Sequence, residues 1–214
     1  MRSDPERRYG VLVPVKPPAV AKSRLAALGD RTRRELAASF AADTVTAALA
    51  CPLVGSLLVV TDDHALAGAL SELGADAVPD GRSDDLNESL VLAAAELRRR
   101  RPDLSPVVLT ADLPGLKPEE LTRALTEAPR NRPAFVPDAD LLGTTLLVAP
   151  SATDLLPRFG PGSRQAHLSA GARELALDDV PGLRRDVDEP DDLAEALMLG
   201  VGSRTALVAT SRRL

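Results

Sequence analysis

Leu109–Thr110–Ala111–Asp112–Leu113–Pro114 is the stretch that decides the fold, and it follows the apolar run Pro106–Val107–Val108–Leu109. The apolar run predicts a short buried strand. Because Pro114 cannot continue a hydrogen-bonded ladder, Asp112 is expected where this strand ends. Ligands of open α/β sheets bind at the carboxyl ends of strands, where a carboxylate can hold a hard cation and the cation can hold phosphates. The ordinary alternative, for Asp-Leu-Pro alone, is a turn or helix-capping aspartate.

The composition is that of a globular protein, and its 214 residues predict a single domain over 1–214. A net charge of −5 argues against a nucleic-acid partner. One cysteine, Cys51, and two histidines exclude an intrachain disulfide framework and a histidine-rich metal site. The charged segment Met1–Arg8 lacks an apolar signal, and no apolar window is long enough for a membrane span. We therefore expect a cytoplasmic protein with no membrane partner.

Strand-like and helix-like segments alternate along the chain, which predicts an α/β fold with a mostly parallel mixed sheet and helices on both faces. The closely spaced pair within 134–148 predicts one antiparallel strand. Residues 1–8 and 203–214 are expected to be loose termini, with an oligomer arm as the alternative for the tail. The apolar face of helix 30–50 leaves a homodimer open, since core packing explains it equally well. The expected strands are 9–15, 56–60, 77–78, 106–110, 134–136, 144–148 and 183–187, and the main helices are 30–50, 62–73, 86–100, one from 117, one ending at 171, and 190–199.

A basic loop follows the first expected strand and carries Lys16, Lys22 and Arg24 within nine residues. Cations at a strand end can neutralise a triphosphate and its leaving pyrophosphate. A solvated charged loop is the plain alternative. The loop contains neither the Walker phosphate-binding pattern nor the glycine fingerprint of dinucleotide-binding folds.

A second acidic segment lies near the end of the chain, in Arg184–Arg185–Asp186–Val187–Asp188–Glu189–Pro190. Asp186 and Asp188 point the same way if this segment is extended. One or both could complete a cation site with Asp112. The following Asp191 and Asp192 are interpreted as residues that cap a helix.

Two glycine-containing stretches, Leu142–Gly143–Thr144–Thr145 and Phe159–Gly160–Pro161–Gly162–Ser163, allow the backbone to approach a ligand closely. Ser163 at a helix start, with free amides behind it, could bind a carboxylate or phosphate. A plain loop with a serine cap is equally compatible. His167 is interpreted as structural. Asn87 could read a purine edge, or it could simply lie at a helix entry.

Together these stretches resemble the phospholactate and phosphoenolpyruvate guanylyltransferases of deazaflavin coenzyme F-420 biosynthesis. The matching segments occur in the family's order between residues 11 and 193. Archaeal-type members carry Gly-Thr-Asn where this chain has Gly143–Thr144–Thr145. That departure makes the chain more similar to the actinobacterial type, for which phosphoenolpyruvate is the implied acceptor, with 2-phospho-L-lactate left open.

The resemblance implies a nucleotidyltransferase fold of the glycosyltransferase-A kind, and a reaction in which the acceptor phosphate attacks the α-phosphorus of GTP and expels pyrophosphate. Asp112 would bind Mg²⁺ together with Asp188 or Asp186. Another phosphorylated acceptor, such as a sugar phosphate or a molybdopterin, and a non-catalytic GTP-binding domain remain the alternatives. The implied roles are GTP binding by Pro14, Lys16, Lys22, Arg24 and Asn87, acceptor binding by Thr145, Gly160 and Ser163, and catalysis by Lys16, Lys22 and Asp112.

Overall fold

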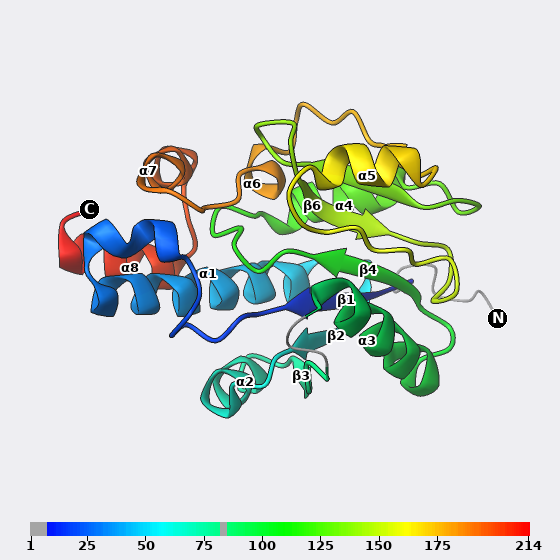
Figure 1. Cartoon of the computed structure of the whole chain (residues 1–214), viewed down its shortest axis with the longest axis horizontal. Helices are drawn as coiled ribbons and strands as arrows, with labels where there is room; N and C mark the ends of the chain where they lie inside the picture. Colours follow the sequence, from blue (N-terminus) through cyan, green and yellow to red (C-terminus); the bar gives the residue numbers. More distant parts are fainter. Residues whose placement is uncertain (1–7, 82–84) are drawn as a thin grey trace.

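A computed structural model describes residues 8–81 and 85–214 and contains one seven-stranded sheet in the order β3-β2-β1-β4-β6-β5-β7 (Figure 1). The strands β1 to β4 are mutually parallel, β6 is antiparallel to both of its neighbours, and β7 is parallel to β5. The expected mixed sheet with one antiparallel strand is therefore confirmed. The strands are β1 Tyr9–Pro14, β2 Val54–Val60, β3 Asp76–Val78, β4 Ser105–Leu109, β5 Ala134–Pro137, β6 Thr144–Val148 and β7 Arg173–Glu174.

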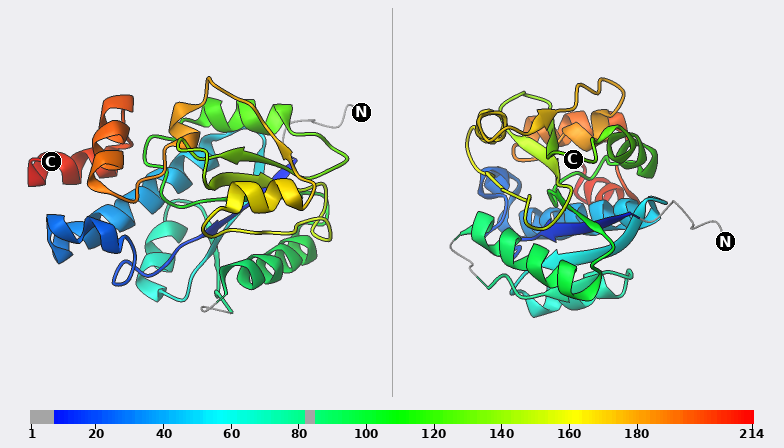
Figure 2. Two further views of the ribbon diagram at one scale, coloured as in Figure 1. Left: turned by 45° about the horizontal axis from the view of Figure 1, so that its top comes forward. Right: turned by 90° about the vertical axis from the view of Figure 1, so that its right-hand side faces the viewer.

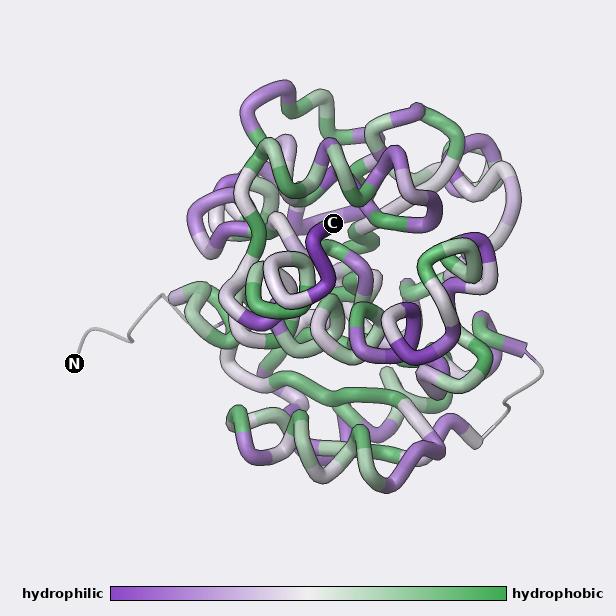
Figure 3. Tube along the Cα trace, turned by 90° about the vertical axis from the view of Figure 1, so that its left-hand side faces the viewer, coloured by the Kyte–Doolittle hydropathy of each residue, from purple (hydrophilic) through white to green (hydrophobic). Residues whose placement is uncertain are grey.

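Helices cover both faces of the sheet because strand side chains alternate between them (Figure 2). Val11 and Val13 of β1 pack under α1, α2 and α4, whereas Leu12 packs against α3 on the opposite face. In Figure 3 the helices change repeatedly between hydrophobic and hydrophilic colours along their turns, as expected of helices with one buried face. The helices are the 3₁₀ helix η1 Ser23–Leu28, α1 Asp30–Ala50, α2 His64–Ser71, α3 Leu86–Arg100, α4 Pro118–Glu127, α5 Ser163–Ser169, α6 Pro181–Arg184, α7 Pro190–Leu199 and α8 Ser203–Arg212.

A third apolar cluster lies beyond the carboxyl ends of the strands and joins segments that are far apart in the sequence. Leu25 of η1 and Phe40 of α1 pack there against Val187 and against Leu193 of α7. All four side chains are fully buried or nearly so. This cluster places the basic loop beside the acidic segment that follows α6.

The expectation of a loose tail over 203–214 is wrong, because residues 203–212 form α8, which packs along α1 (Figure 1). The buried carboxylate of Asp43 accepts hydrogen bonds from the first backbone amides of α8, at Arg204 and Thr205. At the end of α8, Arg212 forms an ion pair with Glu35 at 2.7 Å. Residues 1–7 of the N-terminus lie outside the described part of the chain.

The expected strand over 183–187 is also wrong. Pro181 starts the short helix α6, and the chain then runs extended past Asp112 with one hydrogen bond, from Val187 N to Asp112 O at 3.1 Å, instead of a ladder. The sheet gains β7 at its far edge in place of that strand. Within residues 8–81 and 85–214, no helix combines the length and apolar character needed to cross a membrane.

Candidate active site

A cleft of about 740 Å³ runs along the carboxyl ends of β1, β2 and β4. This is the edge at which open α/β sheets bind their ligands. Most of the residues proposed from the sequence for phosphate and metal binding line this cleft, namely Pro14, Lys16, Lys22, Arg24, Asp112 and Asp188. Asn87, Thr145, Gly160, Ser163 and Asp186 do not line it and are located below.

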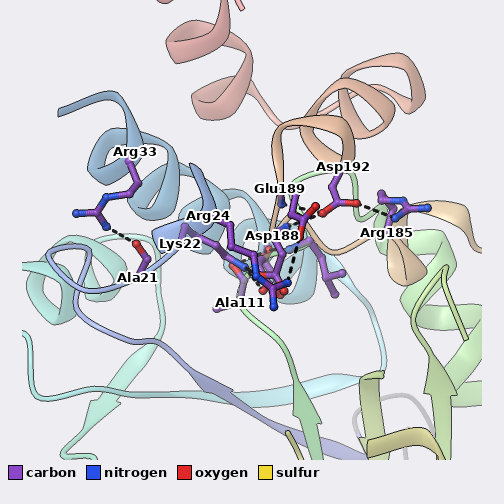
Figure 4. A network of polar contacts seen from close by, with 12 residues as sticks. Ala21, Lys22, Arg24, Arg33, Ala111, Arg185, Asp188, Glu189 and Asp192 are labelled. Atoms are coloured by element: carbon purple, nitrogen blue, oxygen red, sulfur yellow. Dashed lines mark hydrogen bonds and ion pairs between the residues drawn. The ribbon is translucent and has the colours of Figure 1, made fainter. Parts of the chain in front are cut away.

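Lys22 lies at the centre of the site (Figure 4). Its ammonium group donates hydrogen bonds to Asp112 and, at 2.7 Å, to Asp188. Burial alone would lower the pKa of Lys22, but the charges of Asp112 and Asp188 outweigh burial and hold this pKa above its ordinary value. Burial likewise opposes the effect of Lys22 on Asp188, whose pKa nevertheless lies below its ordinary value. The ammonium is thus fixed in its charged form.

The loop that carries Lys22 is held by Arg33, a buried residue of α1 that the sequence did not single out. Its guanidinium donates to the carbonyls of Pro18 and Ala19 at 2.9 Å each and to the carbonyl of Ala21 (Figure 4). Lys22 follows in the left-handed region with φ of 54°, a conformation that costs free energy for a residue other than glycine. Arg33 therefore fixes the backbone that aims the Lys22 ammonium at the carboxylates.

Asp112 and Asp188 line this end of the cleft and Asp186 lies close to both, so the three carboxylates that the sequence grouped come together. Burial, together with the negative charges of Asp112, Asp138 and Asp188, raises the pKa of Asp186 to about 8. Asp112 Oδ1 is buried and has no hydrogen-bond partner among the described residues. Within residues 8–81 and 85–214 no three acidic, histidine or cysteine side chains form a ready-made metal site, and the Lys22 ammonium lies between Asp112 and Asp188.

None of the residues expected to bind an acceptor lines the cleft, although Gly160 follows Phe159, which does. Thr145 of β6 is buried, and its carbonyl accepts a hydrogen bond from Thr110 N at 3.0 Å, two residues before Asp112. The hydroxyls of Thr145 and Thr110 are buried without hydrogen-bond partners in the described chain. Ser163 at the start of α5 is buried, and its amide donates to Gly160 O at 3.1 Å.

Asp138 organises the turn between β5 and β6 and was not singled out from the sequence. Its carboxylate accepts hydrogen bonds from the amides of Leu142 at 2.8 Å and Gly143 at 2.6 Å. A side chain at position 143 would collide with this carboxylate, which explains why glycine stands there. The signal was present in Pro137–Asp138, since an aspartate after a strand commonly closes a turn with its own side chain.

Asn87 joins the cleft to the loop that precedes α5. Its side-chain amide donates to Phe159 O at 3.0 Å and accepts from Phe159 N at 2.7 Å. Phe159 and Leu86, the neighbour of Asn87, both line the cleft. Asn87 therefore lies next to residues that line the cleft, but its amide is engaged in holding this loop.

Comparisons with known proteins identify the family of this chain and its fold. A family model described as "Guanylyl transferase CofC like" matches residues 9–209. The chain belongs to this family. Relatives named phosphoenolpyruvate guanylyltransferase occur in Thermomonospora curvata, 48% identical over 96% of this chain and 90% of the relative, and in Streptomyces coelicolor, 48% identical over 94% and 96%. A solved structure titled a putative nucleotide-diphospho-sugar transferase, from Desulfovibrio desulfuricans G20, superposes with a TM-score of 0.71 at 19% identity, covering 97% of this chain and 96% of that one. The nucleotidyltransferase fold expected from the sequence is thus confirmed.

In this CofC-like guanylyl transferase, His167 is a structural residue, as expected. It is buried against Phe135 and Phe159. Its Nε2 accepts a hydrogen bond from Arg158 N at 3.0 Å, and its Nδ1 contacts the Thr144 hydroxyl at 2.9 Å. Because Nε2 accepts a hydrogen bond, the ring is neutral. Burial, helped by the charge of Arg158, lowers the pKa of His167 to about 4.

We expect this histidine to make folding stability depend on pH. The unfolded chain binds a proton near the ordinary pKa of 6.5, whereas the folded chain binds it near 4. Stability is therefore complete above pH 6.5 and is lost as the pH falls toward 4, which amounts to about 2 kcal/mol between pH 7.5 and 5. Urea unfolding should show that His167→Gln removes this part of the pH dependence. His64→Gln, which deletes the exposed second histidine, should keep it, and equal slopes in both variants would contradict the assignment.

Proposed function

We propose that this chain transfers GMP from GTP to phosphoenolpyruvate and releases pyrophosphate. The observation that carries the proposal is the meeting of Asp112, Asp188 and Lys22, from three distant segments, in the cleft at the strand ends. Membership in the guanylyl transferase family supports the nucleotide. The names of the relatives support phosphoenolpyruvate over 2-phospho-L-lactate.

The reaction needs little acid–base chemistry from the protein, because the acceptor phosphate is already anionic near neutral pH. One of its oxygens forms a bond to the α-phosphorus of GTP, and the bond from that phosphorus to the bridging oxygen of pyrophosphate breaks. The main obstacle is repulsion between two polyanions at short range. Lys16, Lys22 and Arg24 line the cleft with positive charge and would bind the phosphates, so that positioning and charge stabilisation carry the catalysis.

Magnesium suits the donor set at this end of the cleft. Carboxylate oxygens are ligands that Mg²⁺ takes, and Asp112 Oδ1 is a buried carboxylate oxygen with no partner in the described chain. We propose that Asp112 holds the cation together with Asp186 or Asp188. When bound, the cation would offset the negative charge of the phosphates and of the leaving pyrophosphate.

The acceptor is proposed to bind behind Asp112, near Thr145, Gly160 and Ser163. The unpartnered hydroxyls of Thr145 and Thr110 offer hydrogen-bond donors to a carboxylate or phosphate, whereas the Ser163 amide already donates to Gly160 O. Donors of this kind are the usual means of fixing such groups without a further cation.

The test is a direct assay of the product. The purified chain is incubated with GTP, Mg²⁺ and either phosphoenolpyruvate or 2-phospho-L-lactate, and the product is identified by mass spectrometry while pyrophosphate is quantified. A guanosine diphosphate-linked enolpyruvyl product is expected, formed faster than the lactyl product and abolished by EDTA. If the chain binds GTP but releases no pyrophosphate from it in the presence of either acceptor, a sugar phosphate or molybdopterin, it is a non-catalytic GTP-binding domain.

Asn87→Ala should weaken acceptor binding rather than GTP binding. The substitution removes both hydrogen bonds to Phe159, each contributing about 1 kcal/mol, and so loosens the loop before α5. We expect the KM for phosphoenolpyruvate to rise roughly tenfold, with the KM for GTP unchanged, in steady-state kinetics. Asn131→Ala, at an exposed position, is the matched control. If the KM for GTP rises instead, Asn87 acts on the nucleotide, as its position in the sequence suggested.

A further inference from the structure

The cleft has a second end, away from Lys22 and Asp112, that no role above accounts for. Val60 and Leu86 provide apolar walls there, and the carboxylates of Asp62 and Asp80 provide its polar groups. Asp62 follows β2, Asp80 follows β3, and Asp80 N donates to Asp62 Oδ1 at 2.9 Å. This bond holds one oxygen of the Asp62 carboxylate in place and leaves the other available to a ligand.

The order of the strands places this end at the right separation for a base. Because β3, β2, β1 and β4 are adjacent and parallel, the residues after them follow in the order Asp80, Asp62, Lys16 and Asp112. Adjacent strands lie about 4.8 Å apart, so Asp62 lies two steps, roughly 10 Å, and Asp80 three steps, roughly 14 Å, from Asp112. These separations are comparable with the distance between the base and the outer phosphates of an extended nucleoside triphosphate. Phosphates held by Lys16 and Lys22 would therefore leave the base over the ends of β2 and β3.

The chemistry of this end matches guanine and opposes adenine. Guanine presents two adjacent donors, N1–H and the N2 amine, whereas adenine presents an acceptor at N1. An ionised carboxylate only accepts hydrogen bonds. Among the described residues, four aspartates line the cleft. Asp112 and Asp188 contact Lys22, which leaves Asp62 and Asp80 as the carboxylates that could face a base. Asn87 already uses its amide on Phe159.

We infer that Asp62 accepts hydrogen bonds from N1–H and the N2 amine of guanine and selects guanine against adenine, with Asp80 N fixing its carboxylate. This inference rests on the proposed function, because it takes GTP as the nucleotide in the cleft. It adds a specificity-determining residue at the end of β2 to the phosphate-binding residues at the ends of β1 and β4.

The test compares GTP, ITP and ATP as donors for the wild type and Asp62→Asn. ITP keeps N1–H and lacks the N2 amine. In the wild type kcat/KM should fall in the order GTP, ITP, ATP. Asparagine keeps Oδ1 as the acceptor for Asp80 N but replaces the free oxygen with a donor, so kcat/KM for GTP should fall about 10- to 100-fold. The preference for GTP over ATP should shrink more than the preference for GTP over ITP, because ITP shares N1–H with GTP and loses that contact as well.

The matched control is Asp76→Asn, an exposed carboxylate on β3 that lies outside the cleft, and its nucleotide preferences should equal those of the wild type. Thermal unfolding checks that both variants are folded. Unchanged preferences in Asp62→Asn would overturn the inference while leaving the proposed function intact. If the wild type transfers no GMP, the proposed function fails by itself. In that case calorimetry measures the affinities of the wild type and of Asp62→Asn for GTP, ITP and ATP. The ratios of these affinities then decide the inference in place of the ratios of kcat/KM.

Discussion

Asp112→Asn should lower kcat/KM for GMP transfer by about 10³-fold, close to 4 kcal/mol of transition-state stabilisation. Asparagine keeps the shape of the side chain and removes its charge. The substitution weakens the contact of Asp112 with the Lys22 ammonium. It also removes the charge of the carboxylate whose unpartnered Oδ1 is proposed to hold the cation. A bound metal ion contributes several kcal/mol in reactions of this kind. Pyrophosphate release from GTP and phosphoenolpyruvate, measured at saturating Mg²⁺, checks the expectation.

The control for this variant lies at the opposite end of the same strand. Asp103 precedes β4 and forms an ion pair with Arg101 at 2.9 Å, whereas Asp112 follows β4 and contacts Lys22. Asp103→Asn removes an equal charge from an exposed pair and should leave kcat/KM within twofold of the wild type, since exposed pairs contribute little. An Asp112→Asn protein that is folded and retains a tenth or more of the activity would contradict the role given to Asp112.

The elements that could be predicted from the sequence are those with local start and stop signals. Asp85 caps α3 by accepting from Asn87 N and Glu88 N, and Pro190 occupies the first turn of α7. The structure shows these helices over the expected residues 86–100 and 190–199. The errors lie where the deciding contact is distant. The first backbone amides of α8 donate to Asp43, about 160 positions earlier in the chain. No residue within 203–214 indicates that such a partner exists.

The site residues, like the helices, were predictable where the signal is local and not where it depends on distant contacts. The charged groups of the cleft were recognisable because strand ends in an α/β sheet converge, so Lys22, Asp112 and Asp188 could be grouped without coordinates. What the sequence could not show is which groups contact each other. The left-handed backbone of Lys22 and its support by Arg33 depend on tertiary packing. The expected strand at 183–187 failed because a short alternating run does not distinguish a ladder from an extended segment held by one hydrogen bond.

Lys22→Met should lower both activity and stability. The activity loss is expected at 10²- to 10³-fold, the usual cost of removing one group that stabilises charge in the transition state. The side chain of Lys22 is 12% exposed, so its removal leaves Asp112 and Asp188 facing each other and Asp186 with little solvent between them. Removing only one partner of such a group is destabilising, because the remaining charges stay in place. Since Asp188 is half exposed, we expect ~2 kcal/mol, or roughly 6 °C in Tm.

The chain offers a close control for this variant, because Lys117 is its third lysine and is exposed at the start of α4. Its backbone amide and carbonyl, which a substitution keeps, take part in the hydrogen bonds of the helix start. Lys117→Met should match the wild type in Tm and in kcat/KM. Lys22→Arg keeps the charge and should recover most of the lost stability but only part of the activity, because a planar guanidinium cannot replace a compact ammonium between two carboxylates. If Lys22→Met is as stable as the wild type, the three carboxylates do not repel one another in solution. The cleft would then lack the concentrated negative charge that makes Asp112 a cation ligand, and the metal assignment would fail together with the role of Lys22.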